Sequence, residues 1–177
     1  MSDHRASPRK PGQVTRLFDN RTDLSAFRRR IPVIFLSICG VVVAATLTLY
    51  QLHVLDSIWE PFFGDGSRRV LTSRFSRALP FPDAGLGAIA YALEAVLESL
   101  GGPRRVLDAP WTVIAGGLVA TGLGAAALGL VVMQAAVIEA FCTLCLASAA
   151  TSLVIAALVA PELRVAIRTV RTRHRDN

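Results

Sequence analysis

The sequence contains two cysteines, Cys142 and Cys145, inside an otherwise apolar run. Residues at positions i and i+3 of a helix lie on the same face, so the two sulfur atoms can meet. A thiol pair with this spacing can form a disulfide, transfer two electrons or supply half of a metal site. The simplest alternative is an inert pair of small buried residues.

A metal site at this pair is disfavoured, because such sites need about four ligands, usually thiolates and imidazoles. The third cysteine, Cys39, lies in a different apolar run, and the histidines are His4, His53 and His174. These residues are not expected to converge on the pair, so we expect no metal. We favour a redox dithiol, whose reactive form is the thiolate. In an apolar segment, its natural electron acceptor is a lipid-soluble quinone.

The composition predicts a multi-pass membrane protein. The chain has 177 residues, of which 53% are hydrophobic and only 18% are charged, whereas soluble domains carry about 25% charged residues. The charges lie in blocks between long apolar runs. The formal net charge of +6 comes from arginines that flank these runs. Arginines in such positions are topology signals, so we expect no binding to nucleic acid.

Four apolar segments predict an all-α, four-helix transmembrane bundle, because about 20 apolar residues suffice to cross a bilayer. The segments are residues 31–52, 84–100, 111–133 and 137–160. The second is the weakest, since it contains Glu94 and Glu98. These glutamates share a helical face with Tyr91, and ionisable groups in membrane helices usually face the bundle interior.

The connections and tails predict the topology. A tight turn at 134–136 is expected before the last span, and Pro161 is expected to end or kink that span. Residues 1–30 and 161–177 are basic tails, the first of them disordered. The positive-inside rule places both tails in the cytoplasm and the neutral loop 53–82 outside a bacterial inner membrane.

The outer loop contains apolar residues at roughly helical spacing, which predicts a short interfacial helix with Trp59 at the level of the lipid headgroups. The residues are Leu55, Ile58, Trp59, Phe62 and Phe63. Gly64 and Gly66 are expected to end this helix. The cysteine pair then lies near the outer leaflet, on the oxidising side of the membrane.

Glu139 precedes Cys142 by three residues and would share its face if both were helical. It is a candidate site residue, either as a proton relay or as a solvated group at the membrane edge.

Segments between about Ser67 and Thr151 resemble the vitamin K epoxide reductase (VKOR) family. They are Arg69–Ser73, Leu86–Tyr91, Gln134 and Phe141–Ala147. The resemblance implies a four-helix membrane bundle, surrounded by lipid, with a CxxC motif in its last core helix. It also implies a thiol–quinone oxidoreductase that uses a quinone of the menaquinone or ubiquinone type.

The resemblance further implies roles for individual residues. Cys145 would face the quinone, and Cys142 would exchange with partner thiols, such as those of a thioredoxin-like or other thiol protein. Since the loop lacks cysteine, we expect external thiols to reach Cys142 directly. Ser73 would help to arrange the site, and Asp83 would hydrogen-bond a quinone oxygen. Tyr91 matches an aromatic residue of the second span.

One departure from the family leaves two hypotheses open. Members typically carry a second cysteine pair in the first outer loop, whereas this loop has none, and Ser67 stands about where one is expected. The chain is then either an oxidoreductase or a catalytically impaired scaffold or accessory subunit. A transporter is disfavoured, because the spans carry few charges.

Overall fold

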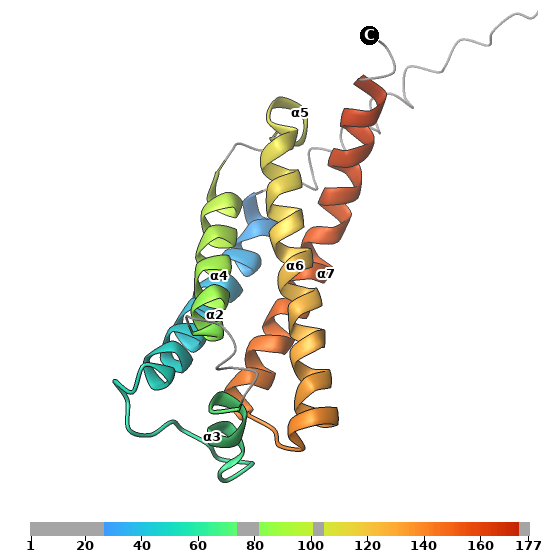
Figure 1. The fold of residues 1–177 in the computed structure, drawn as a ribbon. Coiled ribbons are helices and arrows are strands. Elements are labelled where there is room, and N and C mark those ends of the chain that lie inside the picture. The colour runs from blue at the N-terminus through green and yellow to red at the C-terminus, as the bar shows by residue number, and fades with distance from the viewer. Residues whose placement is uncertain (1–26, 74–81, 101–104, 174–177) are drawn as a thin grey trace, which may run out of the picture.

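The protein is a bundle of helices. The computed structural model describes residues 27–73, 82–100 and 105–173, and all regular secondary structure in these ranges is helical. The long helices are α2 (Phe27–Gln51), α4 (Asp83–Ser99), α6 (Pro110–Met133) and α7 (Thr143–Arg173). The short helices α3 (Gly66–Leu71) and α5 (Arg105–Asp108) lie at opposite ends, here called the α3 end and the α5 end (Figure 1).

Within the described ranges, three helices are long and apolar enough to cross a membrane: Arg30–Gln51, Pro110–Ile138 and Thr143–Thr172. The helix α4, with 17 residues, is not among them. The all-helical class is confirmed, and the long apolar helices are those of a membrane protein. The expected disordered tail lies outside the described residues up to position 26, and its last residues belong to α2.

The long helices pack in two main pairs, α2 with α4 and α6 with α7. All four contribute to one core cluster, which includes Val33, Tyr91, Ala120 and Ile155. At the crossing of α2 and α4, Gly40 lets the backbone approach the Tyr91 ring, since a Cβ on Gly40 would lie 2.6 Å from ring atoms. The predicted shared face of Tyr91, Glu94 and Glu98 is confirmed, because all three are buried.

The predicted turn at 134–136 is wrong. The helix α6 continues into a π-helical turn at Gln134–Ile138, and the chain reverses direction over the next residues. Glu139 has a φ of +50°, a left-handed conformation that ends the helical geometry. The last helix therefore begins at Thr143 instead of Val137.

The last helix does not end at Pro161, which was predicted to end or kink it. The helix α7 passes through Pro161 and continues to Arg173, so most of the expected basic tail is helical. A proline removes one backbone hydrogen bond, and the residues on both sides of Pro161 keep their helical geometry.

The outer loop differs from the prediction as well. The stretch 55–63 is irregular, and the short helix α3 begins at Gly66, where a helix was expected to end. Pro61 explains the difference, because proline lacks a backbone N–H and disfavours helical geometry in the residue before it. Trp59 and Phe62 are 71% and 75% exposed, and their place at a membrane surface stays a prediction.

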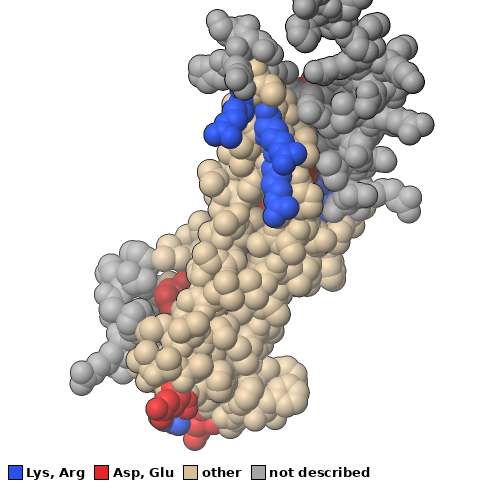
Figure 2. Space-filling view, turned by 90° about the vertical axis from the view of Figure 1, so that its right-hand side faces the viewer, with Lys and Arg blue, Asp and Glu red and all other residues tan. Residues whose placement is uncertain are grey.

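The charges separate along the molecule. On the face shown in Figure 2, basic side chains gather at one end and acidic ones near the other, with a broad uncharged surface between them. Arg164, Arg168 and Arg171 are exposed on α7 beyond Pro161. Such an uncharged belt is what a lipid-embedded bundle requires.

Candidate functional site

The cysteine pair forms the first turn of α7. The carbonyl of Cys142 accepts a hydrogen bond from the N–H of Leu146 at 2.9 Å, and its sulfur accepts one from the N–H of Cys145 at 3.1 Å. Cys142 is therefore the N-cap of the helix, a position that a side-chain acceptor commonly occupies. Both cysteines are free thiols in this structure.

The environment of Cys142 favours its thiolate. Cys142 precedes the apolar span that begins at Thr143. A hydrogen bond from the Cys145 side chain lowers the pKa of Cys142 to about 7, against the opposing effect of burial, and the nearby Ser67 hydroxyl and the Cys145 N–H contribute in the same direction. A cysteine at a helix N-terminus with a lowered pKa is a reactive nucleophile at neutral pH.

The loop between α2 and α3 covers Cys142. The Glu60 carboxylate accepts hydrogen bonds from the backbone N–H of Thr143, at 3.4 Å, and from the Thr143 hydroxyl. The Phe63 and Phe141 rings are in contact, with centroids 5.6 Å apart. At Gly66, a Cβ would lie only 2.1 Å from the carbonyl oxygen of Phe141, so α3 packs directly on the backbone of the cysteine turn.

This cover buries the Cys142 sulfur completely in the conformation of the structure, and direct exchange with external thiols stays a prediction. The exposed fraction of Cys142 is 0%, whereas Cys145 is partly exposed. A sulfur nucleophile must reach the sulfur it attacks, so it needs either movement of the loop or a passage beneath it.

Cys145 faces apolar side chains. It packs on a buried cluster that includes Leu47 and Leu71, and Val43 and Ala84 pack on the same cluster. At the same end of the bundle, the Asp83 carboxylate accepts a hydrogen bond from the Gln51 side chain.

The other predicted site residues lie in different surroundings. The Tyr91 hydroxyl is bonded to the Ser152 hydroxyl at 2.6 Å and donates to the Ser148 carbonyl at 2.8 Å, deeper along α7 than the pair. Ser73 follows α3, where its N–H donates to the Val70 carbonyl. Glu139 is exposed in the turn before α7. Glu139 is in a left-handed conformation outside any helix, so the helical geometry that would place it on one face with Cys142 is not present.

A buried ionic cluster at the α5 end was not predicted. Arg105, 2% exposed, makes ion pairs with Glu98 at 2.9 Å and with Glu162 at 2.8 Å. Beside it, Glu94 is fully buried, and neither of its oxygens has a hydrogen-bond partner among the described residues. The cluster joins α4, α5 and α7 at the opposite end from the cysteines. Its charges were visible in the sequence, but their pairing was not.

The described residues contain no group of three or more histidine, cysteine, aspartate or glutamate side chains placed to hold a metal ion.

The sequence that forms this bundle matches one known protein family. The model of the vitamin K epoxide reductase family matches residues 31–160. The chain belongs to this family. No curated protein matches it. Membership in the VKOR family indicates a membrane thiol–quinone oxidoreductase in general terms, and the matched range contains the long apolar helices and the cysteine pair.

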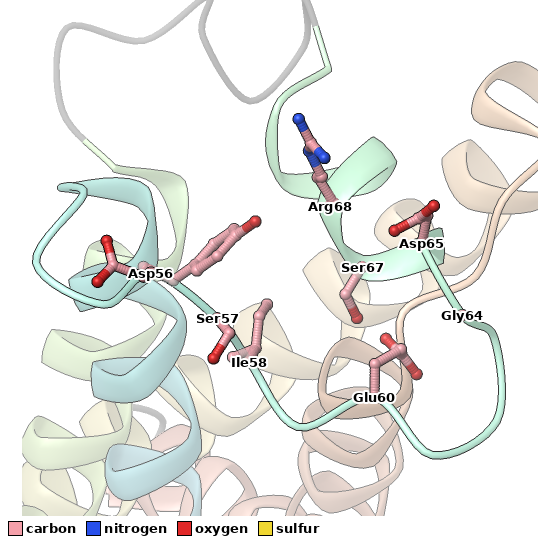
Figure 3. Close-up of a pocket in the computed structure, with 9 residues that line it drawn as sticks. Asp56, Ser57, Ile58, Glu60, Gly64, Asp65, Ser67 and Arg68 are labelled. Atoms are coloured by element: carbon pink, nitrogen blue, oxygen red, sulfur yellow. The ribbon is translucent and has the colours of Figure 1, made fainter.

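The structure places Ser67 beside the cysteine pair. Ser67 lies on α3, is 2% exposed and is close enough to Cys142 to influence its pKa. Its hydroxyl is buried beside the Cys142 sulfur and favours the Cys142 thiolate. Glu60 is the site residue that the sequence reasoning missed, because it was counted only as one charge of a neutral loop. Both side chains line one outer pocket (Figure 3).

Proposed function

We propose that this VKOR-family protein is a thiol–quinone oxidoreductase of a bacterial inner membrane. The helices α2, α4, α6 and α7 form four membrane spans, with both termini in the cytoplasm and the α3 end outside. The basic α5 end and the neutral outer loop support this orientation. The observation that carries the proposal is Cys142, a helix-capping thiol with a lowered pKa, paired with Cys145 in one helical turn.

The two cysteines have different tasks. Cys142 receives electrons from a donor thiol, because it is the outer member of the pair and has the stabilised thiolate. Cys145 is the inner member and packs on an apolar cluster that includes Leu47 of α2 and Leu71 of α3. Its sulfur passes the electron pair inward, and the disulfide between the two cysteines is the oxidised form of the site.

A quinone near Cys145 is supported by the chemistry of this end of the bundle. The cluster on which Cys145 packs includes Leu47, with Val43 and Ala84 against it, and the linked Asp83 and Gln51 side chains offer polar atoms for the quinone oxygens. A bound menaquinone or ubiquinone would supply a two-electron acceptor at this position. Tyr91 links α4 to α7, because its hydroxyl is hydrogen-bonded to the Ser148 carbonyl and to the Ser152 hydroxyl.

The proposal is tested by adding a dithiol and a soluble quinone analogue to the purified protein and following quinone reduction. We expect activity that is lost in both Cys142→Ser and Cys145→Ser and retained in Cys39→Ser, the matched control on α2. Absence of activity, or activity that survives either substitution in the pair, would refute the proposal.

A second candidate is a VKOR-like scaffold or accessory subunit without turnover. It is favoured by the complete cover over Cys142 and by the absence of cysteine from residues 53–82. In that case, a strain with both Cys142 and Cys145 replaced keeps the cellular role of the protein. Loss of that role on replacement of the pair would exclude the scaffold.

A further inference from the structure

The last turns of α7 have two opposite faces, one buried and one basic. The buried residues are Glu162, Ala166 and Thr169, and the exposed basic residues are Arg164, Arg168 and Arg171. Each set is spaced by four and then three residues, so each lies along one side of the helix, and the two sides are opposite. Ala166 packs with Val106 of α5 and Val113 of α6. The three arginines, here called the arginine stripe, therefore face away from the bundle.

The arginine stripe has no neutralising charge among the described residues. The acidic residue of this part of α7, Glu162, is buried and pairs with Arg105 instead. The ion pairs of the described residues involve none of the three stripe arginines. Basic side chains gather at this end of the molecule (Figure 2). The stripe therefore offers three guanidinium groups to an external anion.

The length of α7 places the stripe at a membrane boundary. The helix has 31 residues, which is roughly 46 Å at about 1.5 Å per residue, whereas the hydrocarbon core is about 30 Å thick. A span that begins at Thr143 reaches the far side of the core after about 20 residues, near Leu163. Arg164 then lies at the boundary, and Arg168 and Arg171 lie about 6 and 10 Å beyond it, within or just past the headgroup layer.

Apolar side chains beside the stripe favour lipid over a soluble polyanion. Ile167 and Val170 are 47% and 37% exposed. Ile167 lies three residues after Arg164 and four before Arg171, so it is a neighbour of both on the helix surface. Arginine stems can cover such apolar surface while their guanidinium groups reach polar partners. A lipid supplies acyl chains and a phosphate together, whereas a nucleic acid supplies phosphates without acyl chains.

We propose that the arginine stripe binds the headgroup of an anionic phospholipid in the cytoplasmic leaflet. The guanidinium groups donate hydrogen bonds to the phosphate oxygens, and the net negative charge of the lipid neutralises the stripe. The inference rests on the membrane placement given with the proposed function. A topology signal needs only enough basic residues near the span, whereas a lipid site needs them aligned on one exposed face, as they are on α7.

The test measures lipid binding to the purified full-length protein in detergent. Phosphatidylglycerol, which is anionic, and phosphatidylcholine, which is zwitterionic, are titrated with identical acyl chains, and bound lipids are counted by native mass spectrometry. The double variant Arg168→Gln/Arg171→Gln removes most of the stripe. Its matched control is Arg68→Gln/Arg69→Gln, which removes two exposed arginines of α3 at the opposite end.

We expect one phosphatidylglycerol to bind roughly tenfold tighter than phosphatidylcholine, and added salt to reduce this preference. Arg168→Gln/Arg171→Gln should remove most of the preference, Arg168→Lys/Arg171→Lys should keep most of it, and the α3 control should leave it unchanged. Equal affinities for the two lipids, or a preference that survives the α7 glutamines, would overturn the inference.

Soluble anions test the source of the phosphate. Inorganic phosphate and a short DNA duplex are added at the concentration of the lipid. We expect neither to displace phosphatidylglycerol, because neither contacts the apolar side chains beside the stripe. Displacement by either would show that the ligand is a soluble anion and would refute the lipid assignment.

Quinone reduction is measured in the same samples to separate the two proposals. If the protein reduces quinone but binds both lipids equally, the oxidoreductase stands and the lipid site is refuted. If the stripe selects phosphatidylglycerol but no quinone is reduced, the lipid site stands and the oxidoreductase is refuted.

Discussion

Gly66→Ala tests whether α3 controls access to Cys142. The substitution would place a Cβ 2.1 Å from the Phe141 carbonyl oxygen and 3.0 Å from the Cβ of Phe63. An ordinary carbon–oxygen contact is about 3.3 Å or longer, so α3 and the cysteine turn must separate by more than about 1 Å. The obstacle is a backbone carbonyl, which cannot rotate away as a side chain could.

The magnitude follows from the cost of overpacking. Inserting a methyl group into a tightly packed site costs about 1–3 kcal/mol. If α3 relieves the strain by lifting off, the free energy of opening falls by the same amount. Because 1.4 kcal/mol corresponds to a factor of ten, a change of about 2 kcal/mol raises the open population about 30-fold.

The assay is the rate at which a small maleimide labels Cys142 in the purified, reduced protein with Cys39→Ser and Cys145→Ala. We expect Gly66→Ala to be labelled about 30-fold faster than the parent protein, to within a factor of about ten. The matched controls are Gly122→Ala and Gly129→Ala, where a Cβ meets nothing within 4 Å, and labelling should not change. An unchanged rate in a folded Gly66→Ala protein would refute the idea that α3 limits access.

Three further predictions concern ionisation, the α5 end and the core. In a Cys39→Ser background, the ultraviolet thiolate absorbance of Cys142 should titrate near pH 7. Cys145→Ala removes the hydrogen-bond donor to the Cys142 thiolate and should raise the midpoint toward about pH 8.5. The thiolate fraction at pH 7 then falls roughly fifteenfold. An unshifted midpoint would contradict the hydrogen bond from Cys145 as the cause of the lowered pKa. Arg105→Ala leaves two buried carboxylates without their cation and should lower the free energy of unfolding by about 3–5 kcal/mol. Arg164→Ala, which changes an exposed arginine, should have little effect. Similar denaturation midpoints for the two variants would refute the stabilising role of the cluster. Tyr91→Phe should cost about 1–3 kcal/mol of stability but retain quinone reduction, and a loss of activity at unchanged stability would instead place the hydroxyl at the quinone.

Much of the site could be predicted because its chemistry is local. The spacing of Cys142 and Cys145 is a property of one helical turn, and the two residues do lie in the first turn of α7. The predicted burial of Glu94 and Glu98 beside Tyr91 also held, since positions on one helical face share one environment.

The errors arose at boundaries, where competing local signals have similar strength. Apolar residues continue through the turn before α7, so hydrophobicity alone could not locate the reversal at Glu139. Pro61 outweighed the helical spacing in the outer loop, whereas Pro161 did not interrupt α7. A proline has a fixed local cost, and the surrounding helix determines whether that cost is decisive.

The sequence by itself determined the helical class, the long apolar helices and the thiol pair, because these depend on composition and on short-range periodicity. Only the tertiary structure showed that Glu60, Gly66 and Ser67 cover Cys142, since Glu60 lies 83 positions before the Thr143 it contacts. It likewise paired Arg105 with Glu162, which lies 57 positions away. Periodicity describes neighbours within one helix, whereas the access to the cysteine and its surrounding charge come from segments that meet only when the bundle folds.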